Sequence, residues 1–189
     1  MSALLTLNKE RVSLSKKTPA VLVPDGTTIA LEEGTEVTIV HELGGDFTVR
    51  GVDGRMYRID GDHGEALGKS AREQIAQEQL DALDGALTEE IVWEQLKTCF
   101  DPEIPVNIVE LGLIYKMAIV PLTDNDNRIE IEMTLTAPGC GMGQVIADDV
   151  KRKVEKLSAV SETTVELVFD PPWNPGLMSE AARLMTGMM

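Results

Sequence analysis

One cysteine in a glycine-rich turn is the residue of this sequence best suited to chemistry. Cys140 lies in residues 134–144, which read Thr-Leu-Thr-Ala-Pro-Gly-Cys-Gly-Met-Gly-Gln. Its glycine neighbours indicate a tightly turned, accessible backbone. If a helix follows, its unpaired N–H groups and dipole favour an anion, here a thiolate that attacks electrophiles and binds soft metals. The alternative is a buried cysteine that packs as a small apolar side chain.

The segments on both sides of this turn predict the elements that position it. Residues 128–135 alternate between apolar and polar side chains, which is the period of a half-buried strand. After Gln144, apolar residues recur on one face of a predicted helix: Ile146, Val150, Val154 and Leu157. We therefore expect Cys140 between a strand and a helix, at or just before the first helical turn.

A pair of carboxylates is the second candidate for chemistry. Thr88 is expected to cap a helix that runs to Asp101-Pro102, because proline disfavours helical geometry in the residue before it. Acidic residues at a helix C-terminus are mildly unfavourable, so Asp101 and Glu103 could serve a function. Beside Cys140 they would bind a metal or relay a proton. The alternative is an ordinary turn begun by Asp-Pro.

Composition and charge limit the classes of function. The 189 residues include 17 basic and 32 acidic side chains, and the net charge of −15 opposes binding to nucleic acid. No apolar run approaches the roughly 18 residues that a membrane span requires. The N-terminal segment shows no secretory signal pattern. These features predict a cytoplasmic protein whose partners include neither nucleic acid nor a membrane.

The cysteine count limits any metal site. Cys99 and Cys140 are the two cysteines of the chain, and no Cys/His cluster has zinc-finger spacing. One chain cannot supply four thiolates to a metal cluster. A metal at Cys140 would therefore need other ligand types, a second chain or a partner protein.

The predicted fold class is α+β, with a small N-terminal β-unit followed by an α-β-β-α-β-α sandwich domain. The β-unit occupies residues 1–68 and carries short apolar stretches separated by glycine turns. Its predicted strands are residues 20–23, 35–40, 47–52 and 56–59. Asp53-Gly54 predicts a two-residue hairpin between residues 49–52 and 55–59.

A polar, helix-prone linker at residues 69–87 is expected to join the β-unit to a second domain at residues 88–189. The strands of that domain are expected around residues 113–120, 128–135 and 165–169. Ser179 is expected to cap a short final helix.

Three motifs together resemble the PaaD-like metal-sulfur cluster assembly family of maturation factors. They are Asp-Pro-Glu-Ile-Pro-Val-Asn-Ile-Val-Glu-Leu-Gly-Leu-Ile-Tyr at residues 101–115, Thr-Leu-Thr-Ala-Pro-Gly-Cys at 134–140, and Asp-Pro-Pro-Trp-Asn-Pro at 170–175. The resemblance covers residues 85–186 well. The N-terminal β-unit is similar, more loosely, to that of the longer members of the family.

The resemblance implies an accessory factor for iron–sulfur protein maturation and not an enzyme. It maps the family's reactive cysteine to Cys140, its acidic residues to Asp101 and Glu103, and its threonine to Thr136. The implied cargo is an iron–sulfur cluster or iron, held transiently. The implied partners are iron–sulfur assembly scaffold or carrier proteins and apo client proteins, and a homodimer could complete the site.

Other residues of interest have simpler interpretations. Trp173, between prolines, is a candidate partner contact, although it could equally cap the core beneath its loop. Cys99 matches no family motif and is expected to pack. Methionines crowd the C-terminus, where packing is favoured over soft-metal ligation. Neither His41 nor His63 is assigned to a metal.

Two alternatives to the maturation hypothesis stay open at this point. In the first, the protein is a metal-free adaptor that recruits assembly proteins and clients, and Cys140 is structural. In the second, Cys140 is an enzymatic nucleophile or redox thiol. Such a thiol normally needs a nearby base, and no histidine follows residue 63.

Overall fold

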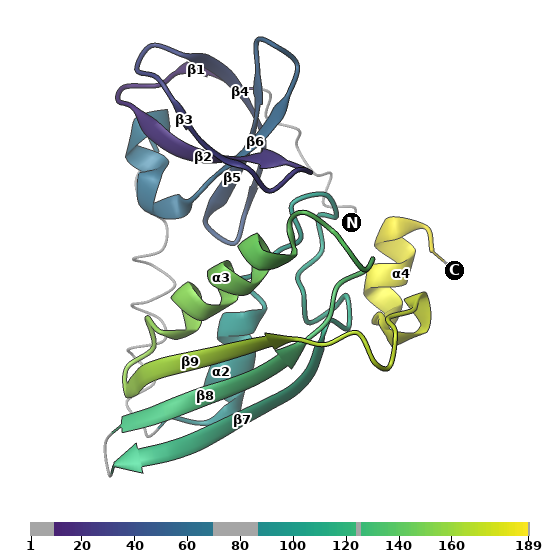
Figure 1. The fold of residues 1–189 in the computed structure, drawn as a ribbon. Helices are drawn as coiled ribbons and strands as arrows, with labels where there is room; N and C mark the ends of the chain where they lie inside the picture. The colour runs from purple at the N-terminus through teal and green to yellow at the C-terminus, as the bar shows by residue number, and fades with distance from the viewer. Residues whose placement is uncertain (1–9, 70–86, 124–125, 189) are drawn as a thin grey trace, which may run out of the picture. The chain divides into compact units, whose positions relative to one another are not determined.

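The computed structural model describes residues 10–69, 87–123 and 126–188. The chain divides into two compact units, Met1–Gln74 and Ile75–Met189. The predicted helical linker falls almost entirely on residues 70–86, outside the described residues. Helices and strands occur together, which confirms the mixed α+β class (Figure 1). No helix within the described ranges is long and apolar enough to cross a membrane.

The first unit is a curled antiparallel sheet around an apolar core (Figure 1). Its strands follow the order β1-β4-β5-β6-β2-β3. They are β1 (Glu10–Ser13), β2 (Thr18–Val23), β3 (Thr28–Leu31), β4 (Glu36–Leu43), β5 (Asp46–Gly51) and β6 (Met56–Ile59). A 3-10 helix, η1 (Gly61–Leu67), follows the last strand. Val49 and Ile59 are fully buried in the core of this unit, which fits the alternation of apolar residues along β5 and β6.

The β5–β6 hairpin forms where the sequence predicts it, but the two-residue turn is wrong. β5 ends at Gly51 and β6 begins at Met56, so the connection is longer. Asp53 shapes it, because its carboxylate accepts hydrogen bonds from the Arg55 N–H at 3.0 Å and the Tyr57 hydroxyl at 2.7 Å. The hydrogen bond from Tyr57 is the main reason why the pKa of Asp53 is lowered.

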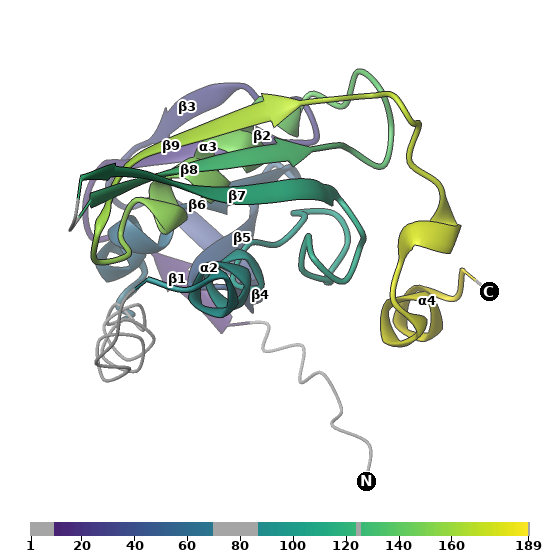
Figure 2. The ribbon, with the colours of Figure 1, turned by 90° about the horizontal axis from the view of Figure 1, so that it is seen from below.

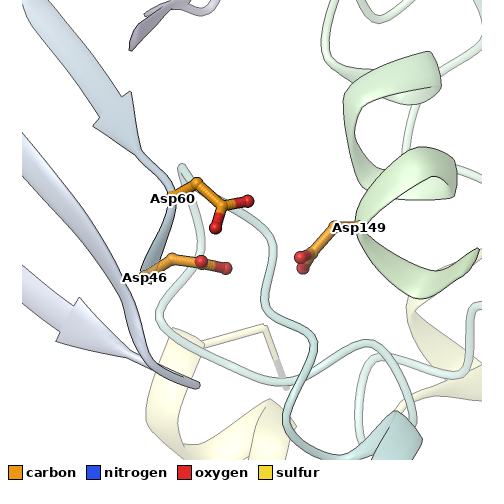
Figure 3. Close-up of side chains that lie close together, drawn as sticks. All are labelled: Asp46, Asp60 and Asp149. Carbon is orange, nitrogen blue, oxygen red and sulfur yellow. The ribbon is translucent and has the colours of Figure 1, made fainter. Parts of the chain in front are cut away.

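A buried ion pair fixes the end of this hairpin. The Asp46 carboxylate lies 2.6 Å from the Arg58 guanidinium and also accepts the Gly61 N–H at 2.9 Å. Asp60 caps η1 by accepting the Asp62 N–H. Figure 3 shows the Asp46 and Asp60 side chains; the third side chain drawn there, Asp149, belongs to α3 of the second unit.

The second unit has a three-stranded sheet in the order β7-β8-β9, with helices covering one face (Figures 1 and 2). Its elements are α2 (Glu89–Leu96), β7 (Ile114–Thr123), β8 (Asp126–Met133), α3 (Gly143–Val154), β9 (Val160–Leu167), η2 (Pro175–Leu177) and α4 (Glu180–Thr186). β7 and β8 are antiparallel, whereas β8 and β9 are parallel and joined through α3. Alternate residues of β8 are buried under the helices: Ile129, Ile131 and Met133.

Side-chain caps begin two of the helices as the sequence predicts. Thr88 accepts the Ile91 N–H at the start of α2 at 3.4 Å, and Ser179 accepts the Ala182 N–H at the start of α4 at 3.1 Å. Both hydroxyls thereby satisfy a backbone N–H group that the helix cannot pair internally.

Buried polar groups tie α2 to α3. The Lys153 ammonium, 2% exposed, donates to the Thr98 carbonyl at 3.0 Å and lies 3.3 Å from the Asp149 carboxylate. The Gln95 amide donates to the Lys153 carbonyl at 2.9 Å. A buried lysine is tolerated only when it is paired in this way, so this network fixes the relative position of the two helices.

Among the predicted boundaries that differ from the structure are the end of α2 and the limits of β9, which begins at Val160 and not at residue 165. α2 ends at Leu96 rather than at Asp101, because Thr98 and Cys99 donate to carbonyls three residues back and Phe100 pairs with Asn107 in an isolated bridge. Cys99 thus lies beyond the helix, although it is fully buried. β9 ends at Leu167, and Phe169 is 44% exposed instead of completing the strand.

Candidate functional site

The three motif-bearing loops lie at the same end of the β7–β8–β9 sheet (Figures 1 and 2). Ile114, which begins β7, pairs with Met133 at the end of β8, and Met133 pairs with Leu167 at the end of β9. The sheet topology therefore gathers segments that are far apart in the sequence. We name them the acidic loop (residues 101–112), the cysteine loop (134–142) and the tryptophan loop (168–178).

Backbone hydrogen bonds join these loops where they leave the sheet. The Leu113 carbonyl accepts the Thr134 N–H at 2.8 Å, which links the acidic and cysteine loops. The Met133 carbonyl accepts the Val168 N–H, also at 2.8 Å, which links β8 to the tryptophan loop. The loops thus start from fixed positions on a regular element, as a functional site requires.

Cys140 occupies a tight turn directly before α3. Its N–H donates to the Ala137 carbonyl at 3.3 Å, and its carbonyl accepts the Gly143 N–H at 3.1 Å. Met142 is the N-cap of α3 and makes no side-chain capping hydrogen bond. The prediction that Cys140 lies just before a helix is confirmed. The side chain is partly exposed, whereas Cys99 is buried, so Cys140 is the accessible thiol of the two.

The glycines in the cysteine loop and at the start of α3 serve different purposes. Gly139 has φ +79°, a conformation that residues with a Cβ rarely adopt, and it is exposed together with Gly141. Gly143 is buried instead, and a Cβ there would lie 2.4 Å from Leu135 Cδ1. The first two glycines keep the backbone around Cys140 open, and the third lets the ends of the loop approach each other.

The two carboxylates of the acidic loop have different surroundings. Asp101 is 6% exposed, and its Oδ1 accepts the Glu103 N–H at 2.8 Å and the Ile104 N–H at 3.0 Å. This contact shapes the loop in the manner of an Asx turn. Glu103 is exposed. The geometry thus gives Asp101 a positioning role and leaves the Glu103 carboxylate accessible.

The role of Asp101 in shaping the loop predicts a difference between two substitutions. Asp101→Ala removes the acceptor of two backbone N–H groups and should lower the free energy of unfolding by about 1–3 kcal/mol. Asp101→Asn keeps an oxygen at that position and should cost less. Urea denaturation of both variants measures the difference, and equal stability would contradict the positioning role.

Trp173 anchors the tryptophan loop to the acidic loop. Its indole N–H donates to the Leu111 carbonyl at 2.8 Å, and the side chain is half-buried. Nearby, the Tyr115 hydroxyl donates to the Pro171 carbonyl at 2.8 Å. Part of the indole is therefore committed to packing within the unit, while its exposed part stays a candidate for partner contact.

Trp173→Phe tests how much this hydrogen bond contributes. The substitution keeps an aromatic ring but removes the donor to the Leu111 carbonyl, so stability should fall by about 1 kcal/mol. Thermal unfolding followed by circular dichroism measures the loss. The matched Trp93→Phe, which changes the other tryptophan of the chain, reports the cost of the ring change elsewhere. An unchanged stability for Trp173→Phe would show that the hydrogen bond contributes nothing.

The threonines before Cys140 differ in a way that the sequence did not predict. Thr136, the predicted supporting residue, is partly exposed. Thr134 is 1% exposed, and its hydroxyl has no hydrogen-bond partner among the described residues. A buried hydroxyl without a hydrogen-bond partner is unusual. A bound group or a water at this place would satisfy it. The alternation of β8 gave no signal for this, because Thr134 follows Glu130 and Glu132 on the partly exposed face of the strand.

Comparison with known proteins shows which family this chain resembles. A family model described as iron–sulfur cluster assembly protein matches residues 89–167, which include the acidic and cysteine loops but not the tryptophan loop. The Fe-S protein maturation auxiliary factor of Porphyromonas gingivalis is 42% identical over 102 residues, which are 54% of this chain and 93% of that protein.

Two further relatives carry related names. The Fe-S protein maturation auxiliary factor SufT of Staphylococcus aureus is 38% identical over 88 residues, 47% of this chain and 96% of its own length. The Fe-S protein maturation auxiliary factor YitW of Bacillus subtilis is 38% identical over 106 residues, 56% of this chain and 99% of its own. The resemblance predicted from the three motifs is confirmed, and the chain belongs to the iron–sulfur cluster assembly protein family.

Proposed function

We propose that this protein is an accessory factor that helps iron–sulfur client proteins to mature, and that Cys140 transiently binds a cluster or iron as cargo. The observation that carries the proposal is the accessible Cys140 thiol in an open turn, at the sheet end where the acidic loop also lies. The names of the relatives, which are maturation auxiliary factors, support the same process.

The ligands available in this chain favour transient over permanent binding. Thiolates are the preferred ligands of iron–sulfur clusters, and Cys99, the other cysteine, is fully buried. Carboxylate ligands from the acidic loop, Asp101 and Glu103, would leave a cluster weakly held, and Glu103 is the more exposed of the two. A scaffold, a client or a second copy of the chain would supply the remaining ligands. A site with an incomplete ligand set makes transfer of the cluster or iron to a client protein easier.

In this proposal the protein works in the cytoplasm as a carrier or helper and not as an enzyme. Asp101 holds the acidic loop in shape through the Glu103 and Ile104 N–H groups. Partners are assembly scaffolds or carriers on one side and apo clients on the other. The N-terminal unit lies outside the matched residues 89–167.

Anaerobic cluster reconstitution tests the binding step. Wild-type protein should acquire the visible absorbance and Mössbauer signals of an iron–sulfur cluster, and Cys140→Ala should not. Cys99→Ala is the matched control, because it removes the buried cysteine, and it should load like the wild type. Loading that is equal in wild type and Cys140→Ala would contradict the proposal. A wild type that binds no cluster would favour a metal-free adaptor.

A further inference from the structure

Strand β7 is an edge of the sheet in the second unit. Among the described residues, β8 is its one neighbour in that sheet, and Figure 1 shows β7 at the margin. All ten residues of β7, Ile114–Thr123, are at least partly exposed, whereas Ile129, Ile131 and Met133 of β8 are buried. The backbone N–H and C=O groups along the free side of an edge strand can pair with another strand.

The sequence of β7 is that of a strand with neighbours on both sides. Residues 111–123 are apolar almost without interruption, and Lys116 is their one charged residue. A near-continuous apolar run is typical of a buried strand, whereas a half-exposed strand alternates. The opposite edge, β9, carries polar residues at alternate positions, among them the exposed Glu162 and Glu166, which discourage pairing. In β7 the corresponding protection, Pro121 and two register shifts, lies toward the ends of the strand.

The register with β8 assigns the side chains of β7 to the two faces of the sheet. Met117 and Ile119 pair with buried residues of β8, so they lie on the face that the helices cover. Lys116, Ala118 and Val120 pair with charged residues of β8 and lie on the open face. Each face of β7 therefore presents apolar side chains to a strand placed beside it.

Charge and side-chain pairing favour a second copy of the chain as that strand. An antiparallel pairing centred on Ala118 would place Met117 opposite Ile119. It would place Lys116 opposite Val120, so no like charges would face each other directly. No acidic residue occurs in residues 111–123, although the net charge of the chain is −15. The repulsion between two copies thus comes from surfaces away from the pairing, and salt screens it.

We propose that two copies of this protein associate through β7, in an antiparallel two-fold pairing centred on Ala118 that joins their three-stranded sheets into one. The two β7 strands begin at Ile114, beside the acidic and cysteine loops, and these starts would lie about 25–30 Å apart at opposite ends of the pairing. Each copy would keep its own Cys140 site, and the remaining cluster ligands would come from a scaffold or a client. The proposal goes beyond the proposed function and does not depend on it.

Sedimentation equilibrium of the full chain tests this association. The wild type should exchange between monomer and dimer, and added salt should strengthen the dimer. Val120→Lys places an ammonium opposite Lys116 of the other copy twice in each dimer, so it should raise the dimer Kd about tenfold. Val120→Glu places a carboxylate there and should retain the dimer. Thr164→Lys is the matched control, because Thr164 is exposed on the same open face of β9, and its Kd should stay unchanged.

Disulfide trapping tests the register and stays informative if Val120→Lys unfolds. In a Cys140→Ala background, Ala118→Cys should form a disulfide-linked dimer on mild oxidation, because the two central Cβ atoms would lie about 4.5–5.5 Å apart. Thr164→Cys in the same background should not. Cys140→Ala alone should dimerise like the wild type, so dimerisation and cluster binding succeed or fail separately. A wild type that stays monomeric at millimolar concentration, equal effects of Val120→Lys and Thr164→Lys, or equal trapping by the two cysteine variants would overturn the proposal.

Discussion

Cells whose only copy of this protein carries Cys140→Ala should show iron–sulfur enzyme activity no higher than cells that lack the protein. The substitution removes the accessible thiol and little else, because Cys140 is partly exposed and its turn is fixed by backbone hydrogen bonds to Ala137 and Gly143. Stability should therefore change by less than about 1 kcal/mol, as for most surface substitutions. The measurement is the activity of an iron–sulfur client enzyme relative to its protein level.

Two further substitutions give this prediction its controls. Cys99→Ala should retain client activity, since Cys99 is buried beyond the end of α2. Cys140→Ser keeps the size of the side chain but removes the sulfur, so it should be as defective as Cys140→Ala. Normal client activity in Cys140→Ala would contradict a role for the thiol. If Cys140→Ser retains client activity and Cys140→Ala does not, the metal-free adaptor is favoured.

Gly112→Ala should strongly destabilise the second unit. Gly112 has φ +69°, where a side chain costs about 1–2 kcal/mol. A Cβ there would also lie 2.2 Å from the Leu177 carbonyl oxygen, and overpacking adds about 1–3 kcal/mol. The obstructing atom belongs to the backbone, so no rotamer change relieves the clash. Urea denaturation should show the combined loss.

Gly187→Ala separates the clash from the backbone effect. Gly187 has φ +72°, but a Cβ there would meet nothing within 4 Å, so only the backbone cost should appear. In a Trp93→Phe background, where Trp173 is the single tryptophan, Gly112→Ala should also shift the tryptophan emission as the tryptophan loop moves. Equal free energies of unfolding for Gly112→Ala and Gly187→Ala would show that the acidic loop and the tryptophan loop can move apart without loss of stability.

Local sequence patterns predicted the elements whose causes are local. The alternation in residues 128–135 predicted β8, and the apolar stripe after Gln144 predicted α3. Thr88 and Ser179 predicted two helix starts, because a capping hydroxyl acts within one turn. The strands β1 and β3 were missed; they lie at the two edges of the sheet, where they pair with β4 and β2.

Contacts between distant residues explain the remaining differences. α2 stops at Leu96 because the chain turns to let Phe100 pair with Asn107, a contact with no signal in the helical pattern. In the candidate site, Cys140 stood out through its glycine neighbours. The Asp101 contacts, the Trp173–Leu111 hydrogen bond and the Thr134 hydroxyl, which has no partner in the described part of the chain, depend on loop conformation. Sequence patterns could therefore propose the residues of the site but not their separate roles.

Cluster transfer is the measurement that tests the central proposal most directly. Protein loaded anaerobically with a cluster is mixed with an apo-ferredoxin, and the ferredoxin spectrum is followed over time against a mixture of free iron and sulfide. We predict that the wild type transfers faster than the free components and that Cys140→Ala does not. Transfer by Cys140→Ala at the wild-type rate would contradict the proposal that the Cys140 thiol holds the cargo.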